Sequence, residues 1–401
     1  MDKVNLNVTP EKDFRANRKW NWWPLFPLYP YGNKSTEFTE IVKNNVWSFD
    51  QLQGVYYVAV PIRLTVIKVS GGLMLFNPLP PTTELIKGIK QLEDIYGPVL
   101  TIVLPTSSGL EHKIAMPAMA RVFREAELWI SPGQWTFPVS LPLEWIGLPK
   151  KRTKILLEDG FPHEESCQWD SLGPIDIGLG RFQEFSCYHK SSCSLLVTDA
   201  LVSISSEPPS LFNDNIEALL FHSRETGEDL PKDTIETRKK GWRRLILFSS
   251  FLRPEKLKIP SLLNVLQKTF KPGLRSAKYH FGLYPFSWQD GWEDSVKELL
   301  SDNNGVIVPP VVERLVFPRA KSSFLNWLER ISNIRGLRTL VPAHYSSKVK
   351  FTQGDAKKLL AQLNKRTWPK ENGNWEFLSW LDSTLLDQGI VPSDPMKKFR
   401  D

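Results

Sequence analysis

The chain has 401 residues, and its 51 lysines and arginines outnumber its 44 acidic residues, which gives a formal charge of +7. Its 31 prolines and 23 glycines are close to average usage, so a collagen-like or low-complexity chain is excluded. The three cysteines lack a CxxC pair, which excludes a disulfide framework, a zinc ribbon and a thioredoxin-like motif. We expect unpaired thiols in a reducing compartment.

The start of the chain lacks the apolar stretch of a secretory signal, and the longest uncharged stretch, Leu128–Leu143, is too short and proline-rich to span a membrane. We therefore expect a cytoplasmic protein that is soluble or peripheral to a membrane. Residues 1–46 are predicted to form an N-terminal extension. Within it, the aromatic and proline-rich Trp20–Gly32 is expected to lie extended over a face of the core.

The first third of the chain alternates strands and helices. Three β-branched runs come first, with Gly71-Gly72 as a hairpin turn before the third, and a helix from Thr82 to Tyr96 follows. The remaining predicted elements here are a buried strand, a helix and another strand. The strands of this region are Val55–Pro61, Arg63–Val69, Leu73–Phe76, Val99–Leu104 and Glu127–Ser131, and the second helix is His112–Arg124. This order predicts an α/β fold with a mixed sheet.

The rest of the chain has fewer clear strands. Residues 132–180 are expected to be irregular, and residues 207–310 are predicted to form a helical insertion. Residues 47–206 would then form the core, which residues 311–401 complete. The later predicted strands are Arg181–His189, Ser194–Asp199 and Leu337–His344, and the terminal helices are Asp355–Arg366 and Trp375–Leu386.

Five side chains near predicted strand ends are candidates for a metal site: Glu111, His112, His189, Asp199 and His344. Ligands of α/β sheets gather outside the carboxyl ends of strands, and imidazole with carboxylate suits Zn, Fe or Mn. Each residue also has an ordinary interpretation. Glu111 would suit a first helical turn, Asp199 a helix N-cap and His344 a turn. The other histidines (His163, His222 and His280) lack a partner at ligand spacing and are predicted to be structural.

A basic segment, TRKKGWRRLILFSSFLR, has the spacing of an amphipathic helix. It could contact an anionic membrane or an acidic partner, or it could be a surface helix with an apolar face on the core. Its bases are Arg238, Lys239, Lys240, Arg243 and Arg244. Because bases and acids are interleaved along the chain and no recognition motif occurs, nucleic acid is an unlikely partner.

The order of elements and the segments TSSGLEH, CYHKSSCSLLVTDAL and VPAH resemble the metallo-β-lactamase fold. This resemblance implies an αββα sandwich of mixed sheets. The superfamily carries a His-x-His-x-Asp-His loop, a later His, a bridging Asp and a final His. In this chain Ser107 and Gly109 stand where the first two histidines would be. The other positions correspond to Glu111 for the first Asp, His112, His189, Asp199 for the bridging Asp, and His344.

The resemblance implies a reduced metal centre. The first superfamily site would retain only His189 and Asp199, whereas the second would keep a complete set of Glu111, His112, Asp199 and His344. One Zn or Fe ion and no metal at all are both open. With one ion, activated water would attack a carbonyl or phosphoryl group of an unknown small-molecule substrate. Glu111 could alternatively be the general base.

A second resemblance is more specific. WWPLFPLYPYG, LPTSSGLEHK, PGQWTFP, LLVTDALVSI and RKKGWRRLILF are similar to signatures of an uncharacterised domain-of-unknown-function family of cyanobacteria and plastids. Membership implies no activity. Two hypotheses therefore stay open: a hydrolase-like protein with a single metal, and a non-catalytic ligand-binding or assembly factor at the photosynthetic (thylakoid) membrane.

Overall fold

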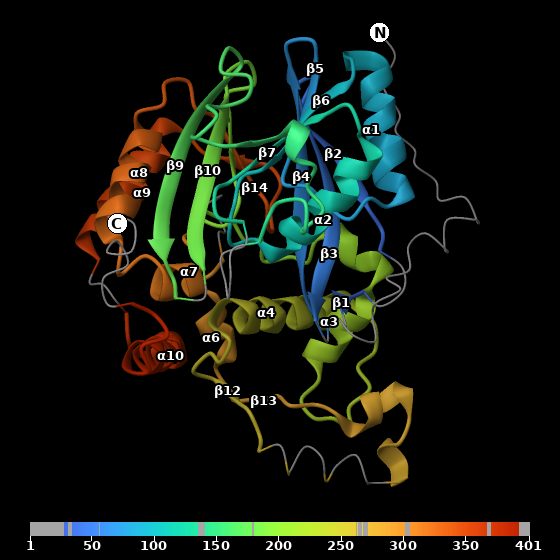
Figure 1. The fold of residues 1–401 in the computed structure, drawn as a ribbon. Helices are drawn as coiled ribbons and strands as arrows, with labels where there is room; N and C mark the ends of the chain where they lie inside the picture. Colours follow the sequence, from blue (N-terminus) through green and yellow to red (C-terminus); the bar gives the residue numbers. More distant parts are fainter. Residues whose placement is uncertain are drawn as a thin grey trace.

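Two β-sheets face each other between two layers of helices in the computed structural model of this chain (Figure 1). The structure describes residues 28–30, 34–55, 57–134, 141–178, 180–261, 263, 267, 272–300, 305–366 and 370–392. Most of the predicted aromatic wrap, and most of residues 1–46 before position 34, lie outside the described residues. Within that extension, Tyr29 is buried in a short strand.

The first sheet has the order β1-β3-β4-β5-β6-β7-β8, with β2 paired to β3. Its pairs are antiparallel as far as β5 and parallel from β5 to β8. The two predicted strands Val55–Pro61 and Arg63–Val69 are continuous from Val58 onward. The turn before this single strand lies at Tyr57, where φ is 64°. The strands are β1 (Leu28–Tyr29), β2 (Glu37–Val42), β3 (Val46–Val55), β4 (Val58–Val69), β5 (Gly72–Phe76), β6 (Val99–Leu104), β7 (Glu127–Ile130) and β8 (Thr153–Ile155).

The second sheet has the order β15-β14-β11-β10-β9 and is antiparallel except for the parallel pair β11 and β14. The prediction of an irregular segment over residues 132–180 is wrong for β9. That strand contains Gly173 and Pro174, which an edge position tolerates and which hid it from the sequence pattern. The strands are β9 (Cys167–Asp176), β10 (Arg181–His189), β11 (Ser194–Val197), β14 (Thr339–Pro342) and β15 (Val349–Lys350).

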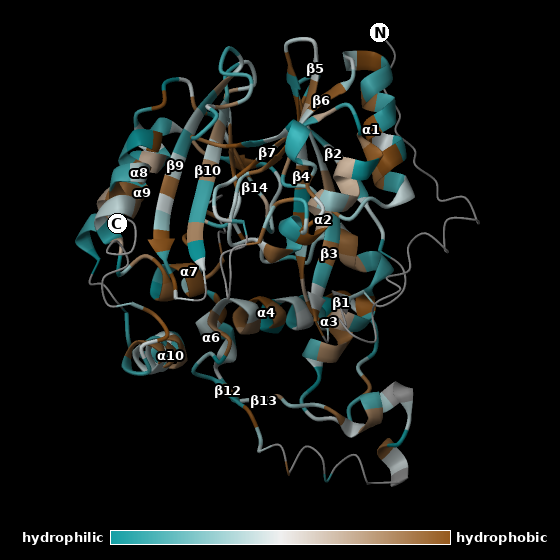
Figure 2. Cartoon of the chain, viewed as in Figure 1, coloured by the Kyte–Doolittle hydropathy of each residue, from teal (hydrophilic) through white to brown (hydrophobic). Residues whose placement is uncertain are grey.

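Each sheet carries helices on its outer face. Helices α1 (Thr83–Tyr96) and α2 (Leu110–Val122) pack on the first sheet, and α8 (Lys321–Ser332) and α9 (Gln353–Lys365) pack on the second. A third apolar cluster fills the space between the sheets and includes Phe76 and Phe185. Strands β7 and β14 in the middle of the molecule are accordingly apolar (Figure 2). The predicted αββα sandwich with mixed sheets is confirmed.

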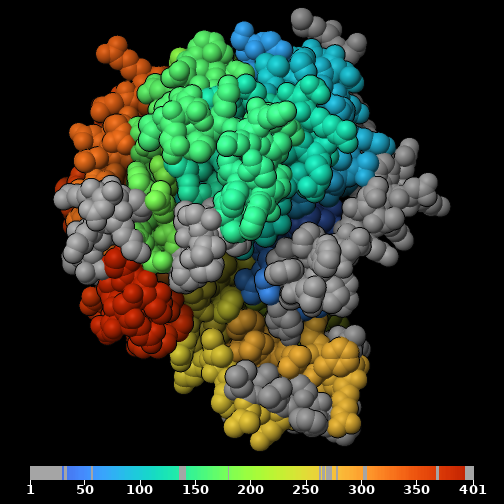
Figure 3. All heavy atoms as spheres, viewed as in Figure 1, coloured from blue at the N-terminus to red at the C-terminus, as the bar shows by residue number. Residues whose placement is uncertain are grey.

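The region of the chain between β11 and β14 is mainly helical and shares an apolar core with the first sheet. Buried Trp242 and Leu245 pack in one cluster with Leu52 of β3 and Ala59 of β4. The described residues between Leu257 and Trp288 form a projection at the bottom of the molecule (Figures 1 and 3). The elements of this region and the C-terminus are α3 (Ile216–Ser223), α4 (Ile235–Phe251), β12 (Leu257–Lys258), β13 (Ser287–Trp288), α6 (Trp292–Val296), α7 (Pro310–Leu315) and α10 (Glu376–Asp387). Short 3-10 helices occupy Lys150–Arg152, Ser210–Asp214, Pro272–Leu274, Ala277–Gly282 and Gly373–Trp375.

The basic segment forms α4, and its apolar residues lie inside the core rather than at the surface. Four of its five bases pair with acids. Arg238 pairs with Asp233, Lys239 with Glu207, and both Lys240 and Arg244 with Glu225. Contact with an anionic membrane through these residues stays a prediction, but the apolar face that would enter the lipid is covered. None of the described helices combines the length and apolar composition that crossing a bilayer requires.

Gly241 sets the spacing between α3 and α4. A Cβ atom there would lie 1.9 Å from the carbonyl oxygen of Leu219, which belongs to the backbone of α3. We expect Gly241→Ala to lower the free energy of unfolding by roughly 2–3 kcal/mol, because the helices must separate. The control is Gly354→Ala in α9, where the nearest atom would be 3.6 Å away and the change should be neutral or slightly stabilising. Urea denaturation of both variants checks this, and equal stabilities would contradict it.

His222 of α3 is fully buried, and Nε2 donates to the carbonyl of Tyr57 at 3.1 Å. Burial lowers its pKa from 6.5 to about 4, and the charge of Arg244 acts in the same direction. Between pH 6.5 and about 4, the unfolded chain therefore binds a proton at His222 that the folded chain does not bind. Stability is full above pH 6.5 and is lost as the pH falls toward 4. Between pH 7 and pH 5 the wild-type protein should lose about 2 kcal/mol more than His222→Gln. Identical pH dependence of unfolding in the two proteins would refute this.

Candidate functional site

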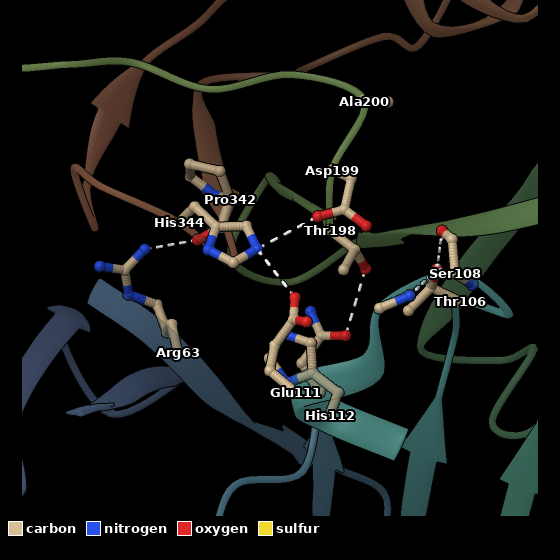
Figure 4. Close-up of polar contacts among 12 residues, drawn as sticks. Arg63, Thr106, Ser108, Glu111, His112, Thr198, Asp199, Ala200, Pro342 and His344 are labelled. Carbon is tan, nitrogen blue, oxygen red and sulfur yellow. Dashed lines mark hydrogen bonds and ion pairs between the residues drawn. The ribbon is translucent and has the colours of Figure 1, made fainter. Parts of the chain in front are cut away.

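His344, directly after β14, is the centre of a polar cluster at one edge of the two sheets (Figure 4). Its Nε2 lies 3.1 Å from Oδ1 of Asp199 and 3.3 Å from Oε1 of Glu111. Its Nδ1 lies 3.2 Å from the carbonyl oxygen of Pro61, which only accepts, so Nδ1 carries a proton. The three side chains come from the ends of β14 and β11 and from the first turn of α2.

The two carboxylates change the protonation of this imidazole. Burial alone would lower the pKa of His344, but the hydrogen bonds and charges of Asp199 and Glu111 raise it to about 10. Burial would raise the pKa of Glu111, but its hydrogen bond with His344 and the positive charge of that ring lower it to about 2. At neutral pH the structure therefore holds an imidazolium between two carboxylates.

His112 completes the cluster from the next position of α2. Its side chain is 0% exposed, and Nδ1 donates to the carbonyl oxygen of Pro78 at 3.1 Å. Burial lowers its pKa, so the ring is neutral, and Nε2 then presents a lone pair. This buried Nε2 has no hydrogen-bond partner among the described residues. One ligand atom from each of Glu111, His112 and His344 lies within 4.8 Å of the others.

Glu184 fixes the segment that carries Asp199, and it was not among the site residues predicted from the sequence. Its fully buried carboxylate accepts the backbone N–H groups of Thr198, Asp199 and Ala200 at 2.7–2.9 Å. Burial, together with the charge of Asp199, raises the pKa of Glu184 to about 7, and the three backbone hydrogen bonds oppose this rise. A charged residue inside the apolar run of β10 was the available signal, because a buried charge requires partners.

The structure does not bring His189 to this cluster. Its Nε2 bonds to the carbonyl of Lys68 at 2.8 Å, whereas His344 contacts the carbonyl of Pro61 on the same strand, β4. Seven residues separate these contacts, roughly 23 Å along a strand. The expected convergence is wrong for His189, because β10 and β11 are antiparallel. The end of β10 therefore lies beside the start of β11, and Asp199 follows the other end.

Ser107 and Gly109 lie in the loop before α2, and neither supplies an imidazole to the cluster. The Ser107 hydroxyl donates to the carbonyl of Arg181 at 2.9 Å and is thereby committed to the backbone. A Cβ atom on Gly109 would lie 2.7 Å from Cγ2 of Thr106. A histidine at position 109 would therefore require the Thr106 side chain to move.

Three of the four side chains of the cluster are partly exposed to solvent. The side chains of Glu111, Asp199 and His344 are 23%, 18% and 14% exposed, while His112 lies beneath them. Solvent therefore reaches the carboxylates and His344, and the lone pair of His112 is sheltered. The arrangement suits a cation bound from the solvent side, with two imidazoles and carboxylates as its donors.

Three solved structures are similar to this chain over most of its length. A metallo-β-lactamase from Pontibacter korlensis is 12% identical, with 83% of this chain and 100% of that chain covered and a TM-score of 0.36. The Flv1 flavodiiron core from Synechocystis sp. PCC6803 is 8% identical, with coverage of 82% and 61% and a TM-score of 0.39. A flavoprotein from Thermotoga maritima is 10% identical, with coverage of 83% and 62% and a TM-score of 0.40.

Each of these TM-scores is below 0.5, so the architecture of this chain is described from its own sheets and helices. None of the curated proteins compared with the chain matches it. The sequence model of one family, described as a domain of unknown function (DUF4336), matches residues 43–361. That stretch contains Glu111, His112, Asp199 and His344, and the chain belongs to the DUF4336 family.

Proposed function

We propose that this protein binds one divalent transition-metal ion at the Glu111–His112–Asp199–His344 cluster and acts as a hydrolase on a small carbonyl or phosphoryl ester. The observation that supports it most strongly is the unpartnered Nε2 of His112. A buried nitrogen without a partner costs free energy unless something occupies its lone pair. A metal ion is a suitable occupant because Glu111 and His344 offer ligand atoms beside it.

The donors fit such an ion by chemistry as well as position. Two imidazoles and two carboxylates suit Zn or Fe, and both histidines have Nδ1 held by a backbone carbonyl. This arrangement presents Nε2 of each ring to the site and fixes the ring orientation. The carboxylates that retain the imidazolium of His344 would equally retain a cation.

A single ion is supported rather than a pair. Ser107 and Gly109 supply no imidazole, and His189 lies at the other end of the sheet. Glu184 is committed to three backbone N–H groups beside Asp199 and is not directed at an ion. Among the described residues, the remaining donors suffice for one coordination sphere.

The chain's own residues would divide the work of hydrolysis. When bound, the ion supplies a water of lowered pKa and polarises the substrate oxygen. Glu111 is the most exposed acid of the cluster and is ionised at neutral pH, so while one of its carboxylate oxygens would hold the ion, the other is placed to accept a proton from an attacking water. Asp199 and His344 hold the cluster together, and His112 anchors it from below.

Metal content tests the binding step. Purified wild-type protein, reconstituted with zinc and desalted, should carry about one equivalent, and His112→Ala should carry below about 0.2 equivalents, because the sheltered donor is lost. The matched control is His189→Ala, which removes a buried histidine outside the cluster and should keep one equivalent. Elemental analysis checks this. A metal-free wild type, or equal content in both variants, would contradict the proposal.

Hydrolysis tests the role of the carboxylate. Glu111→Gln keeps the size of the side chain but removes its charge. We expect at least about a 100-fold loss of activity on chromogenic carboxyl and phosphodiester substrates, the range for general base catalysis. The control is Glu217→Gln, which changes an exposed glutamate in the first turn of α3, the same helical position as Glu111 in α2. Wild-type rates in Glu111→Gln would refute the role.

A further inference from the structure

Arg63 of β4 is a buried arginine in the middle of an apolar strand, and it makes an unusual set of contacts. Its side chain is 2% exposed. Nη2 donates to the carbonyl of Tyr345 at 2.8 Å, and Nη1 donates to the carbonyls of Pro342 and Ser346, the latter at 3.3 Å. All three acceptors belong to the segment around His344, so one guanidinium holds the main chain on both sides of that residue. Figure 4 shows the contact with Pro342.

The main chain of β4 adds further contacts to the same segment. Ile62, next to Arg63, forms an isolated antiparallel bridge with His344, and the carbonyl of Pro61 accepts from Nδ1 of His344. Three successive residues of one strand therefore touch the His344 segment. Tyr345 adopts a left-handed φ of 59°, which a non-glycine residue keeps only where its surroundings hold it. The bond from Arg63 to the Tyr345 carbonyl is one such restraint.

Asp50 makes the buried guanidinium possible. It lies opposite Arg63 in the β3–β4 pairing, and its Oδ1 is 2.7 Å from Nε of Arg63. The carboxylate balances the charge, because an unpaired buried arginine would be strongly destabilising. Asp50 thereby leaves both Nη atoms free to bond the carbonyls of the His344 segment. A hydrophobic residue at either position would pack as well but would bond none of them.

We propose that Arg63 is a positioning residue for the metal centre: held by Asp50, it fixes the main chain on both sides of His344 and so orients that imidazole toward Glu111 and Asp199. The inference rests on the proposed function, because its clearest consequence is on metal affinity. Loss of an outer contact that orients a metal ligand weakens metal binding by about 10- to 100-fold.

A neighbouring cavity makes the idea open to chemical rescue. A cavity of about 350 Å³ is lined by Asp50, Arg63, Tyr345 and Ser346, among other residues. Arg63→Ala would enlarge this cavity at the place that the guanidinium now fills. A free guanidinium ion is small enough to enter from it and to meet the same carboxylate and carbonyls.

The experiment measures Co²⁺ affinity by the visible spectrum of the bound ion, for wild type, Arg63→Ala, Arg63→Lys and a control. The control is Arg330→Ala, which removes an arginine that also pairs with an aspartate, Asp170, but lies on helix α8 outside the second sheet with its side chain half exposed. We expect Arg63→Ala to weaken Co²⁺ binding by at least about 10-fold with an altered spectrum, and Arg330→Ala to bind as wild type. Guanidinium chloride, far below denaturing concentration, should restore most of the affinity of Arg63→Ala.

Arg63→Lys keeps the charge beside Asp50 but lacks the planar fork that reaches three carbonyls, so its affinity should also fall by about 10-fold. If circular dichroism shows that Arg63→Ala is unfolded, the Co²⁺ affinity of Arg63→Lys tests the inference in its place. Wild-type affinity and spectrum in a folded Arg63 variant would overturn the inference.

Failure of the proposed function gives a different result. If wild type binds no Co²⁺, the ¹⁵N shifts of the His344 imidazole in the metal-free protein serve as the readout. Arg63→Lys should then shift the His344 resonances and leave those of His189 unchanged. Unchanged His344 resonances would overturn the positioning role independently of any metal.

Discussion

The candidate site is built around one imidazole that contacts two carboxylates from separate parts of the chain. His344 lies 3.1 Å from Asp199 and 3.3 Å from Glu111. Two carboxylates on one imidazole repel each other, and the positive charge of His344 makes their proximity favourable. Because these residues follow β14, follow β11 and begin α2, their meeting requires both sheets and a helix to be in register.

Buried charges inside the strands secure this meeting. Glu184 of β10 holds the segment around Asp199 through backbone N–H groups, and Arg63 of β4 holds the segment around His344 through backbone carbonyls. The two devices are complementary, since an anion accepts from amides and a cation donates to carbonyls. Each lies in a strand of a different sheet, so the rigid sandwich positions loops that would otherwise be free to move.

Much of the fold could be predicted from local pattern. The apolar runs of β6, β10 and β11 and the helix α1 depend on neighbours in sequence, and the structure has them. Strand β9 was missed because Gly173 and Pro174 interrupt its pattern. His189 was misplaced because strand direction decides which ends meet, and direction depends on tertiary pairing. Arg63 bonds a partner more than 200 residues away, and Glu184 bonds partners about 15 residues away, so no local pattern specifies their roles. A charge within an apolar strand is nevertheless a usable signal.

The most direct test of the account is X-ray diffraction from crystals of the zinc-loaded protein, with anomalous difference maps on both sides of the zinc absorption edge. The account predicts one peak per chain, bonded to Nε2 of His112 and Nε2 of His344 at about 2.0–2.1 Å, with a carboxylate oxygen of Glu111 or Asp199 as a further ligand. A map without a peak at this position, or with Nε2 of His112 in contact with a protein side chain instead, would contradict it.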